Sequence, residues 1–371
     1  MLNGVIVINK EPGFTSSNVI SKLRGILQMK KIGHTGTLDP EAVGVLPVCL
    51  GNATKLTELI ADHDKEYTAV MRLGLLTDTQ DMTGTVLAEF PGELRELTEQ
   101  WEQQPDGVLR KIQEAAAALT GHISQTPPMY SAVRVNGQHL YELARAGQTV
   151  ERKAREIAVY ELDILSVKLP EIRIHVRCSK GTYIRTLCED LGRLLGTGAA
   201  MQYLQRTRVG IFSLDQALTL KEIEKLVHGE MERTGLPQRE AAESCMRERL
   251  IPTDAFFEKA PKVTVQTASA PYLQNGNPMS FKDTDMSAEL IRQCRAEAER
   301  AENAPAQTAT SGKAAVSGRS ETVGEVKSSG QTADGRTLLR MYDPEGMFRA
   351  LYIYSKESDQ LIVYKMFPEQ Q

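Results

Sequence analysis

The sequence contains few cysteines and few aromatic residues. Its 371 residues include five cysteines, one tryptophan and only 5% aromatic side chains. The cysteines are odd in number and show no CxxC or Cys/His spacing of the kind that holds zinc. A disulfide-rich scaffold is therefore excluded, no metal site is expected, and reduced thiols in the cytoplasm are the predicted state.

Long hydrophobic runs and a strong charge of one sign are also missing. No stretch approaches the roughly 18 apolar residues of a membrane span, and the first apolar run, residues 5–8, is too short for a signal-peptide core. The net charge is −4, so a surface for nucleic acid must be a local basic patch. Membrane, collagen-like and histone-like proteins are excluded, and a cytoplasmic protein is expected.

Strand and helix patterns alternate without a regular rhythm, which predicts an α+β fold with a mainly antiparallel sheet. Residues 171–178 alternate between apolar and polar side chains, which is typical of a half-buried strand. A helix is expected after residues 15–17, which offer N-cap side chains before apolar residues at helical spacing. Asn136 and Gly137 predict a tight hairpin.

The composition predicts two domains, residues 1–250 and a smaller β-rich domain at 251–371. Between Phe281 and Tyr342 there is no aromatic residue, and residues 301–336 are rich in Ala, Ser, Thr, Gly and Glu. Such a segment buries too little apolar surface to become ordered. We therefore expect a disordered insertion at 284–336 within the second domain.

The segment from Lys30 to Pro40 is the most informative part of the chain for chemistry. It contains two glycines, a histidine at His34 and an aspartate at Asp39, with lysines at its start. No Gly-Lys-Ser/Thr follows the glycines, so it is not a Walker loop. From spacing alone, Asp39 is equally well a turn carboxylate, and His34 a solvated loop histidine.

Four motifs in order give this segment a family context. GHTGTLDP (33–40), followed by AVGVLPVCLGNATK (42–55), closely resembles the signature of the bacterial tRNA pseudouridine synthase B (TruB) family. The similarity extends over residues 1–260. The other motifs are DKEYTAVMRLG (64–74), PPMYSAVRVNGQHLYELARAG (127–147) and CSKGTYIRTLCEDLG (178–192).

The resemblance implies a fold, a domain arrangement and an activity. The fold is that of pseudouridine synthases, a mainly antiparallel mixed sheet with helices, and residues 127–155 correspond to an RNA-gripping loop. Residues 251–371 correspond to a PUA-like domain. The implied activity is isomerisation of uridine to pseudouridine at position 55, in the TΨC loop of tRNA, with base flipping.

The resemblance assigns three catalytic residues. Asp39 corresponds to the catalytic aspartate, Arg185 to the arginine that pairs with it, and Tyr67 to the tyrosine placed against the target base, where it assists proton removal at C5. A carboxylate suits a reaction that breaks the N1–C1′ bond and forms C5–C1′, as nucleophile or as stabiliser of a cationic sugar. The sequence leaves open whether Asp39 attacks the sugar, attacks the base or removes a sugar proton. Without the resemblance, Arg185 reads as an exposed helix-start residue and Tyr67 as a strand aromatic.

The resemblance also implies residues that bind the RNA. His34 corresponds to the histidine that enters the RNA loop and replaces the stacking of the extruded base. Tyr183 and Leu204 correspond to residues lining the uracil pocket, although Leu204 fits ordinary core packing equally well. Basic residues beside the motifs are expected to contact phosphates; they are Lys30, Lys31, Arg134, Arg145, Arg152, Lys153, Arg155, Lys180, Arg206 and Arg208.

The expected partner is the T-arm of tRNA, with no cofactor, no metal, no membrane and no obligate protein partner, and the chain is expected to be a monomer. Two other functions remain open from the residues. One is an RNA-binding or tRNA-folding module in which catalysis is secondary. The other is a hydrolase with Asp39 as nucleophile, which would release uracil or phosphate, whereas isomerisation leaves the mass of the RNA unchanged.

Overall fold

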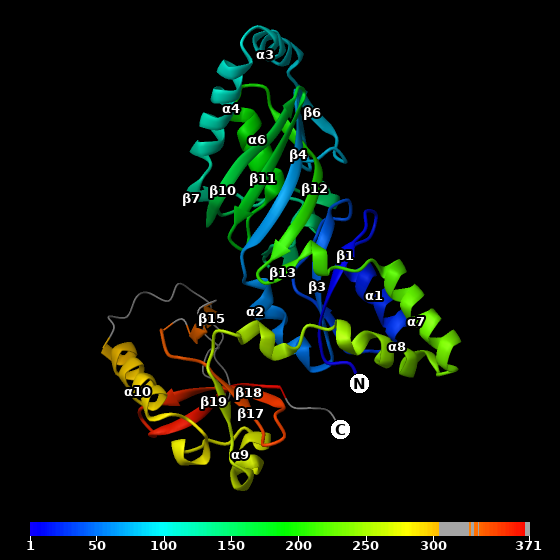
Figure 1. The fold of residues 1–371 in the computed structure, drawn as a ribbon. Coiled ribbons are helices and arrows are strands. Elements are labelled where there is room, and N and C mark those ends of the chain that lie inside the picture. Colours follow the sequence, from blue (N-terminus) through cyan, green and yellow to red (C-terminus); the bar gives the residue numbers. More distant parts are fainter. Residues whose placement is uncertain (304–325, 328–329, 333, 368–371) are drawn as a thin grey trace.

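The structure is a computed structural model that describes residues 1–303, 326–327, 330–332 and 334–367. Figure 1 shows an elongated body crossed by one large sheet, with a smaller β-rich module at one end. The helices are α1 (Ser16–Leu27), α2 (Thr57–Ala61), α3 (Pro91–Gln103), α4 (Pro105–Ala118), α5 (Leu140–Arg145), α6 (Ile184–Leu194), α7 (Leu220–Thr234), α8 (Gln238–Met246), α9 (Ala270–Asn275) and α10 (Ala288–Asn303). The strands are β1 (Gly4–Lys10), β2 (Ile32–His34), β3 (Val43–Leu50), β4 (Lys65–Leu73), β5 (Leu75–Thr77), β6 (Val86–Glu89), β7 (Gly121–Gln125), β8 (Arg134–Val135), β9 (Gln138–His139), β10 (Arg155–Lys168), β11 (Glu171–Cys178), β12 (Ala199–Val209), β13 (Phe212–Ser213), β14 (Lys262–Thr264), β15 (Val326–Lys327), β16 (Gln331–Thr332), β17 (Leu339–Tyr342), β18 (Phe348–Ser355) and β19 (Gln360–Met366).

The main sheet confirms the prediction of a mainly antiparallel mixed sheet. Its strand order is β1-β3-β12-β4-β11-β10-β7, with β2 beside β3 and β13 beside β12. Only β12 and β3 run parallel among these pairs, where Arg206 lies opposite Gly44. Gly44 has a φ of 100°, and a Cβ there would lie 2.2 Å from the backbone oxygen of Arg206. Glycine therefore permits the close approach that brings the first residues of β3 next to β12.

Local sequence explains the elements that carry the sheet and its cover. In β11 every second residue is buried, as the alternation predicts, whereas the residues between face outward. Helix α1 begins where Thr15 accepts a hydrogen bond from the backbone N–H of Asn18 at 3.0 Å. Its apolar face, including Val19 and Leu23, packs into a core that also contains Ile223 of α7 and Met246 of α8.

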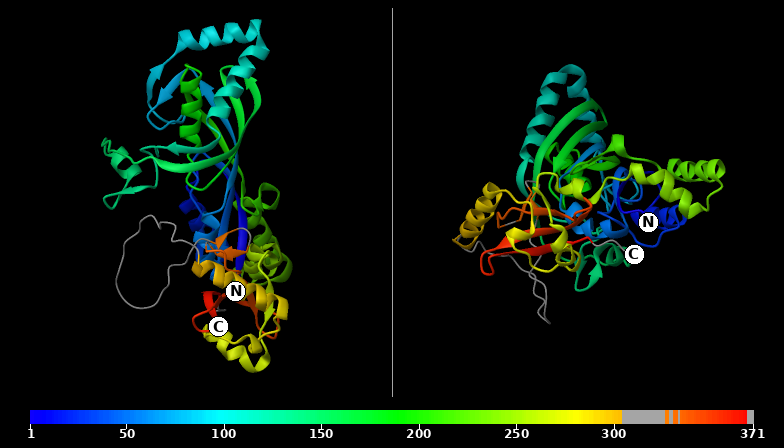
Figure 2. Two further views of the ribbon diagram at one scale, coloured as in Figure 1. Left: turned by 90° about the vertical axis from the view of Figure 1, so that its left-hand side faces the viewer. Right: turned by 60° about the horizontal axis from the view of Figure 1, so that its bottom comes forward.

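Residues 127–155 form a lobe that stands out from the body, as the left view of Figure 2 shows. The lobe contains the β8–β9 hairpin and the short helix α5. Asn136 and Gly137 turn the hairpin with φ angles of 52° and 86°, which confirms the prediction from this dipeptide. The lobe therefore offers a surface beside the body and not an addition to its core.

The C-terminal module is a four-stranded sheet in the order β14-β17-β18-β19. It is joined to the body through a shared hydrophobic cluster in which Phe257, Leu351 and Phe367 pack together with Val5 and Phe212. This apolar contact connects the last strands of the chain to the first. It holds the module against the body near β1.

The prediction of disorder over residues 284–336 is wrong for residues 284–303. Residues 288–303 form α10, which buries Cys294 and Ala298 against the module's sheet. The carboxylate of Glu297 accepts a hydrogen bond from the backbone N–H of Thr337 at 2.8 Å. Leucine, cysteine and alanine at 290, 294 and 298 form an apolar stripe, which supplies the burial that the aromatic content did not indicate. Residues 304–325 lie outside the described residues.

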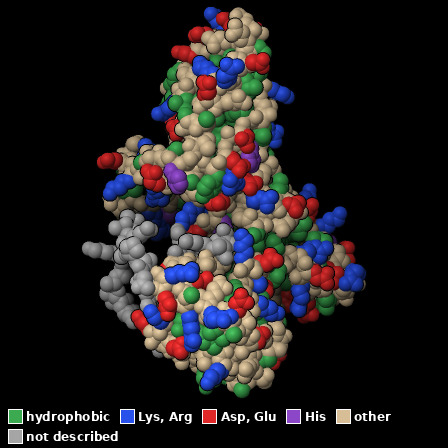
Figure 3. All heavy atoms as spheres, turned by 60° about the vertical axis from the view of Figure 1, so that its left-hand side comes forward, with side chains coloured by type: hydrophobic (Ala, Val, Ile, Leu, Met, Phe, Trp, Pro, Cys, Tyr) green, Lys and Arg blue, Asp and Glu red, His purple; other side chains and the backbone are tan. Residues whose placement is uncertain are grey.

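The surface of the molecule carries charges of both signs. On the face drawn in Figure 3, basic and acidic side chains lie interspersed over the body, the lobe and the module. This mixture agrees with the net charge of −4. In the part of the chain that the structure describes, no helix is long and apolar enough to cross a membrane.

Candidate active site

A buried lysine, Lys10 of β1, holds the end of the loop between β2 and β3 through hydrogen bonds. Lys10 of β1 is 1% exposed, and its ammonium group donates to the backbone oxygens of Pro40 at 2.7 Å and Ala42 at 2.6 Å. On the other side of the aspartate, the backbone N–H of Leu38 donates to the Ser16 hydroxyl at 3.0 Å. The backbone on both sides of Asp39 is therefore held in place.

Asp39 and Arg185 form a two-point ion pair. The Nε of Arg185 lies 2.9 Å from Oδ2 of Asp39, and Nη2 donates to Oδ1 at 3.3 Å. The arginine side chain is only 6% exposed, whereas the aspartate side chain keeps 37% of its surface open. A guanidinium that meets both oxygens fixes the plane of the carboxylate, and the open part of the aspartate is free to meet a ligand.

Other groups hold Arg185 in that orientation. Its Nη1 donates to the backbone oxygen of Thr79 at 3.0 Å, and its Nη2 to that of Tyr130 at 2.8 Å. A second carboxylate, that of Asp81, lies 3.9 Å from Nη1. Arg185 is therefore not the exposed helix-start residue that its position alone suggested, because tertiary contacts bury and pair it.

The electrostatics of Asp39 reflect two opposed effects. Desolvation by the surrounding protein raises the pKa of the Asp39 carboxyl group, and Asp81 acts in the same direction, whereas Arg185 lowers it. Desolvation is the largest of these influences. Arg185 therefore offsets part of the cost of keeping a partly buried carboxylate ionised.

Tyr67 and Leu204 lie on neighbouring strands beside this pair. Tyr67 on β4 lies opposite Arg206 on β12, and Leu204 lies opposite Ala69. Tyr67 and Leu204 are 8% and 7% exposed and belong to one hydrophobic cluster with Leu38. Burial raises the pKa of Tyr67 to about 12, although Arg206 acts in the opposite direction, so the side chain is a neutral phenol at neutral pH.

Tyr183 precedes α6, directly before the helix that carries Arg185. Its backbone N–H donates to the side-chain oxygen of Gln125 at 2.8 Å, and its own oxygen accepts from that amide at 3.1 Å. This exchange fixes the start of the helix against β7. The backbone two residues before Arg185 is thereby tied to the sheet.

The other expected RNA-binding residues lie along the loop before Asp39. His34 is half-buried on β2, with its Nδ1 3.2 Å from the oxygen of Gly36. Burial lowers the pKa of His34, with a smaller effect of Arg206 in the same direction, so it is neutral at neutral pH. Lys31 donates to Asn52 at 2.9 Å, and Lys30 is exposed. The structure thus brings Asp39 and Arg185 into contact but leaves both lysines outside their ion pair.

Three residues of this region were not assigned to it from the sequence. Lys10 and Asp81 belong to the surroundings of Asp39, but each comes from a separate segment with no spacing signal. Arg206 was expected among the phosphate contacts, and that expectation is wrong, because its side chain is only 2% exposed and its Nε donates to the oxygen of Val45 at 2.7 Å. The available sequence signal is that Arg206 lies two residues after Leu204 on β12, so both side chains point to the same, buried face of the strand.

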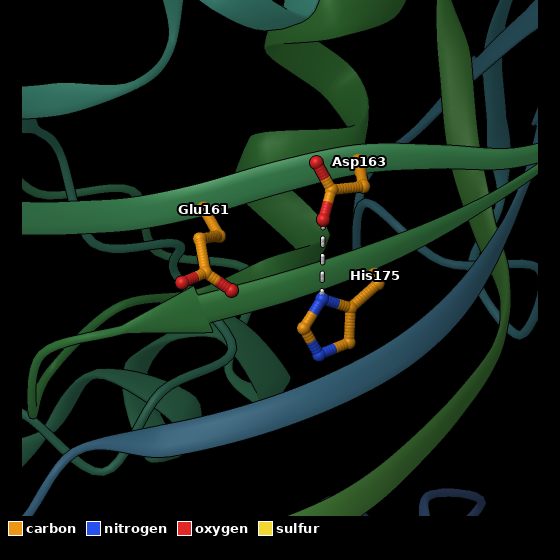
Figure 4. Close-up of side chains that lie close together, drawn as sticks. All are labelled: Glu161, Asp163 and His175. Carbon is orange, nitrogen blue, oxygen red and sulfur yellow. Dashed lines mark ion pairs between the residues drawn. The ribbon is translucent and has the colours of Figure 1, made fainter.

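A group of metal-ligand side chains lies apart from the loop, on β10 and β11. Figure 4 shows Glu161, Asp163 and His175 with their side chains close together. The Nδ1 of His175 lies 3.7 Å from Asp163, and Arg177 already lies 2.8 Å from Glu161. Because a guanidinium occupies one carboxylate and the acidic side chains are largely exposed, we read this group as surface ion pairs.

The sequence and structure are similar to known proteins over most of the chain. The family model described as TruB family pseudouridylate synthase (N terminal domain) matches residues 24–184, and the tRNA pseudouridylate synthase B C-terminal domain matches residues 185–258. The tRNA pseudouridine synthase B of Lachnoclostridium phytofermentans is 46% identical over 286 residues, which are 75% of this chain and 84% of the relative. That of Pseudomonas aeruginosa is 41% identical over 278 residues, again 75% and 84%.

The fold is shared with a more distant structure. The crystal structure of a Cbf5-Nop10-Gar1 complex contains a chain with a TM-score of 0.60 and 23% identity, which covers 99% of this chain and 87% of that one. At this identity the likeness concerns the fold alone. The family models and the curated relatives define this chain as a pseudouridine synthase, an isomerase. Within that class, the chain belongs to the TruB family.

Proposed function

We propose that this chain isomerises uridine to pseudouridine at position 55, in the TΨC loop of tRNA, with Asp39 as the catalytic group. The observation that carries the proposal is the ion pair in which Arg185 meets both oxygens of Asp39 while 37% of the aspartate side chain stays exposed. The names of the relatives, tRNA pseudouridine synthase B, support tRNA as the substrate.

The chemistry requires an ionised carboxylate with a fixed orientation. Breaking the N1–C1′ bond leaves electron deficiency at C1′, which a carboxylate stabilises by charge or by a covalent bond. Arg185 holds the carboxylate plane, and Lys10 holds the backbone after it. Tyr67 and Leu204 then offer an aromatic and an aliphatic surface to a flipped uracil.

RNA recognition is assigned to the loop and the lobe. His34 is neutral and half-buried beside the site, which suits stacking in the space that the extruded base leaves. The lobe formed by residues 127–155 stands out from the body and contributes the backbone oxygen of Tyr130 to Arg185. It is therefore both near the catalytic pair and accessible to RNA. The monomeric state, the absence of an obligate protein partner, the PUA-like role of residues 251–371 and the cytoplasmic location stay predictions.

Site-resolved pseudouridine mapping of an unmodified tRNA transcript tests this function. The wild-type protein is expected to modify position 55, and Asp39→Asn to lose at least about 10³-fold in rate while it still binds tRNA. A variant as active as the wild type would refute the role of Asp39. Release of free uracil would instead indicate a hydrolase, and equal support of tRNA folding by the inactive variant would indicate a separate RNA-folding function.

A further inference from the structure

A second buried arginine lies beside the site and has no part in the function proposed above. Arg206 of β12 lies directly opposite Tyr67 of β4. Its Nε is fixed by the oxygen of Val45 at 2.7 Å. Its Nη2 is buried and, among the described residues, has no hydrogen-bond partner. A buried guanidinium that retains an unused donor is unfavourable for stability, and such a group calls for an explanation.

The titratable groups around Arg206 indicate which side chain its positive charge stabilises. It lowers the pKa of Lys10 from β1, of His34 from β2 and of Lys65 from β4, so each of these neighbours is made less basic by its charge. Tyr67 differs from them, because its hydroxyl group becomes an anion when it loses a proton, and the positive charge of Arg206 directly opposite lowers the pKa of that group. Negative charge on the Tyr67 oxygen is the charge that this arrangement stabilises.

We propose that Arg206 is the positioning residue for Tyr67, fixing its phenolic oxygen and stabilising negative charge on it while the proton at C5 of the uracil is removed. The proposal rests on the proposed function. Val45 fixes the Nε of Arg206, and the register of β12 and β4 places Arg206 directly opposite Tyr67. The unused Nη2 donor leaves the guanidinium with hydrogen-bonding capacity for added charge nearby.

The proton step balances within the isomerisation. After C5 has bonded to C1′, the C5–H bond breaks and its electron pair re-forms the C5–C6 double bond of the uracil. The Tyr67 phenol gives the proton that it carries at rest to N1, which the broken glycosidic bond has left one proton short. The phenolate oxygen formed in this way, stabilised by Arg206, takes the proton from C5. No oxidant, reductant or further reactant is needed, and Arg206 remains protonated throughout.

The test combines Arg206→Gln with a deuterium label at C5 of the target uridine. The single-turnover rate is expected to fall about 100-fold, which is typical when one donor to a developing negative charge is lost. The deuterium isotope effect is expected to rise above that of the wild type, because proton removal becomes slower relative to the other steps. Binding of tRNA is expected to change less than about threefold, and Arg206→Lys, which keeps the charge, to recover part of the rate.

The matched control is Arg173→Gln, at an exposed arginine on β11, the strand on the other side of β4. This variant is expected to leave rate and isotope effect unchanged. In a Tyr67→Phe background, Arg206→Gln is expected to change the rate less than about twofold further, because the two residues act as one unit. A lower rate with an unchanged isotope effect, or additive losses in the double variant, would overturn the proposal. So would loss of the cooperative melting transition in both the Gln and the Lys variants, since that shows a structural role. If the wild-type protein forms no pseudouridine in tRNA, the proposed function itself fails.

Discussion

The carboxylate of Asp39 meets the guanidinium of Arg185 at both of its oxygens, with Nε 2.9 Å from Oδ2 and Nη2 3.3 Å from Oδ1. The two residues are 146 positions apart in the chain. The backbone oxygens of Thr79 and Tyr130 fix the same guanidinium. The orientation of the carboxylate therefore depends on three segments of the chain besides its own, those that contain Thr79, Tyr130 and Arg185.

Replacing Arg185 by glutamine is expected to destabilise the protein. The change leaves Asp39 and Asp81 without their buried cation and lowers the free energy of unfolding by about 3 kcal/mol. Chemical denaturation measures the loss. Arg173→Gln on β11 is the control, because that side chain is exposed, and its effect is expected to stay below about 0.5 kcal/mol. Equal effects of the two variants would contradict a buried ion pair.

The pH dependence of the reaction follows from the raised pKa of Asp39. An acid whose pKa is raised by burial takes up a proton at a higher pH than usual, so activity is expected to fall on acidification above the ordinary value of 3.8. Arg185 lowers this pKa, and its replacement is therefore expected to move the midpoint further upward. Single-turnover rates between about pH 4 and 8 measure both midpoints. A downward shift in the variant would show that Arg185 does not act on the carboxylate.

Lys10→Met is expected to slow the reaction, because it releases the backbone oxygens of Pro40 and Ala42 next to Asp39, the proposed catalytic residue. Burial lowers the pKa of Lys10 to about 8, from 10.5. Above pH 8 the unfolded chain binds the proton more tightly than the folded one, so this residue's contribution to stability rises with pH until about 10.5.

The measurement is the free energy of unfolding of the wild type minus that of Lys10→Met, followed with pH. The difference is expected to grow by up to about 3 kcal/mol between pH 8 and 10.5. Lys111→Met on α4, an exposed position, is expected to show no such trend. A constant difference would mean that Lys10 titrates normally.

His34→Ala is expected to impair the use of folded tRNA more than the use of a small flexible T-loop analogue. The imidazole lies half-buried beside Gly36, and its stacking is needed only where a structured loop must give up its target base. A loss of about tenfold or more in kcat/KM is expected on tRNA, since base–aromatic stacking contributes about 1–3 kcal/mol. Equal losses on both RNAs would contradict the stacking role.

Cys294→Asp is expected to destabilise the C-terminal module, because Cys294 of α10 is 3% exposed against its sheet. A buried unpaired carboxylate lowers the free energy of unfolding by about 3 kcal/mol or more. Arg292→Asp, an exposed position on the same helix, is the control. Identical melting temperatures of the two variants would mean that α10 does not pack as described.

Which segments become strands and helices was largely predictable from the chain. The alternation at 171–178 gave β11 with the same bounds, and Asn136-Gly137 gave the hairpin. The prediction of disorder was wrong for residues 284–303 because a segment without aromatic residues can still bury aliphatic and small side chains. Helix α10 instead packs through a stripe of small and aliphatic side chains at 290, 294 and 298, which helical spacing would have revealed.

By itself the sequence determined the family motifs, the types of local element and the segment that carries Asp39, because these depend on short-range spacing and backbone preference. Only the tertiary structure decided that Arg185 is buried against Asp39, that Lys10 holds the following backbone, and that Arg206 faces Tyr67 instead of RNA phosphates. The sequence does not show which Lys and Arg side chains are buried, because their burial depends on which strands pair across the sheet. That pairing is a long-range property of the packed chain.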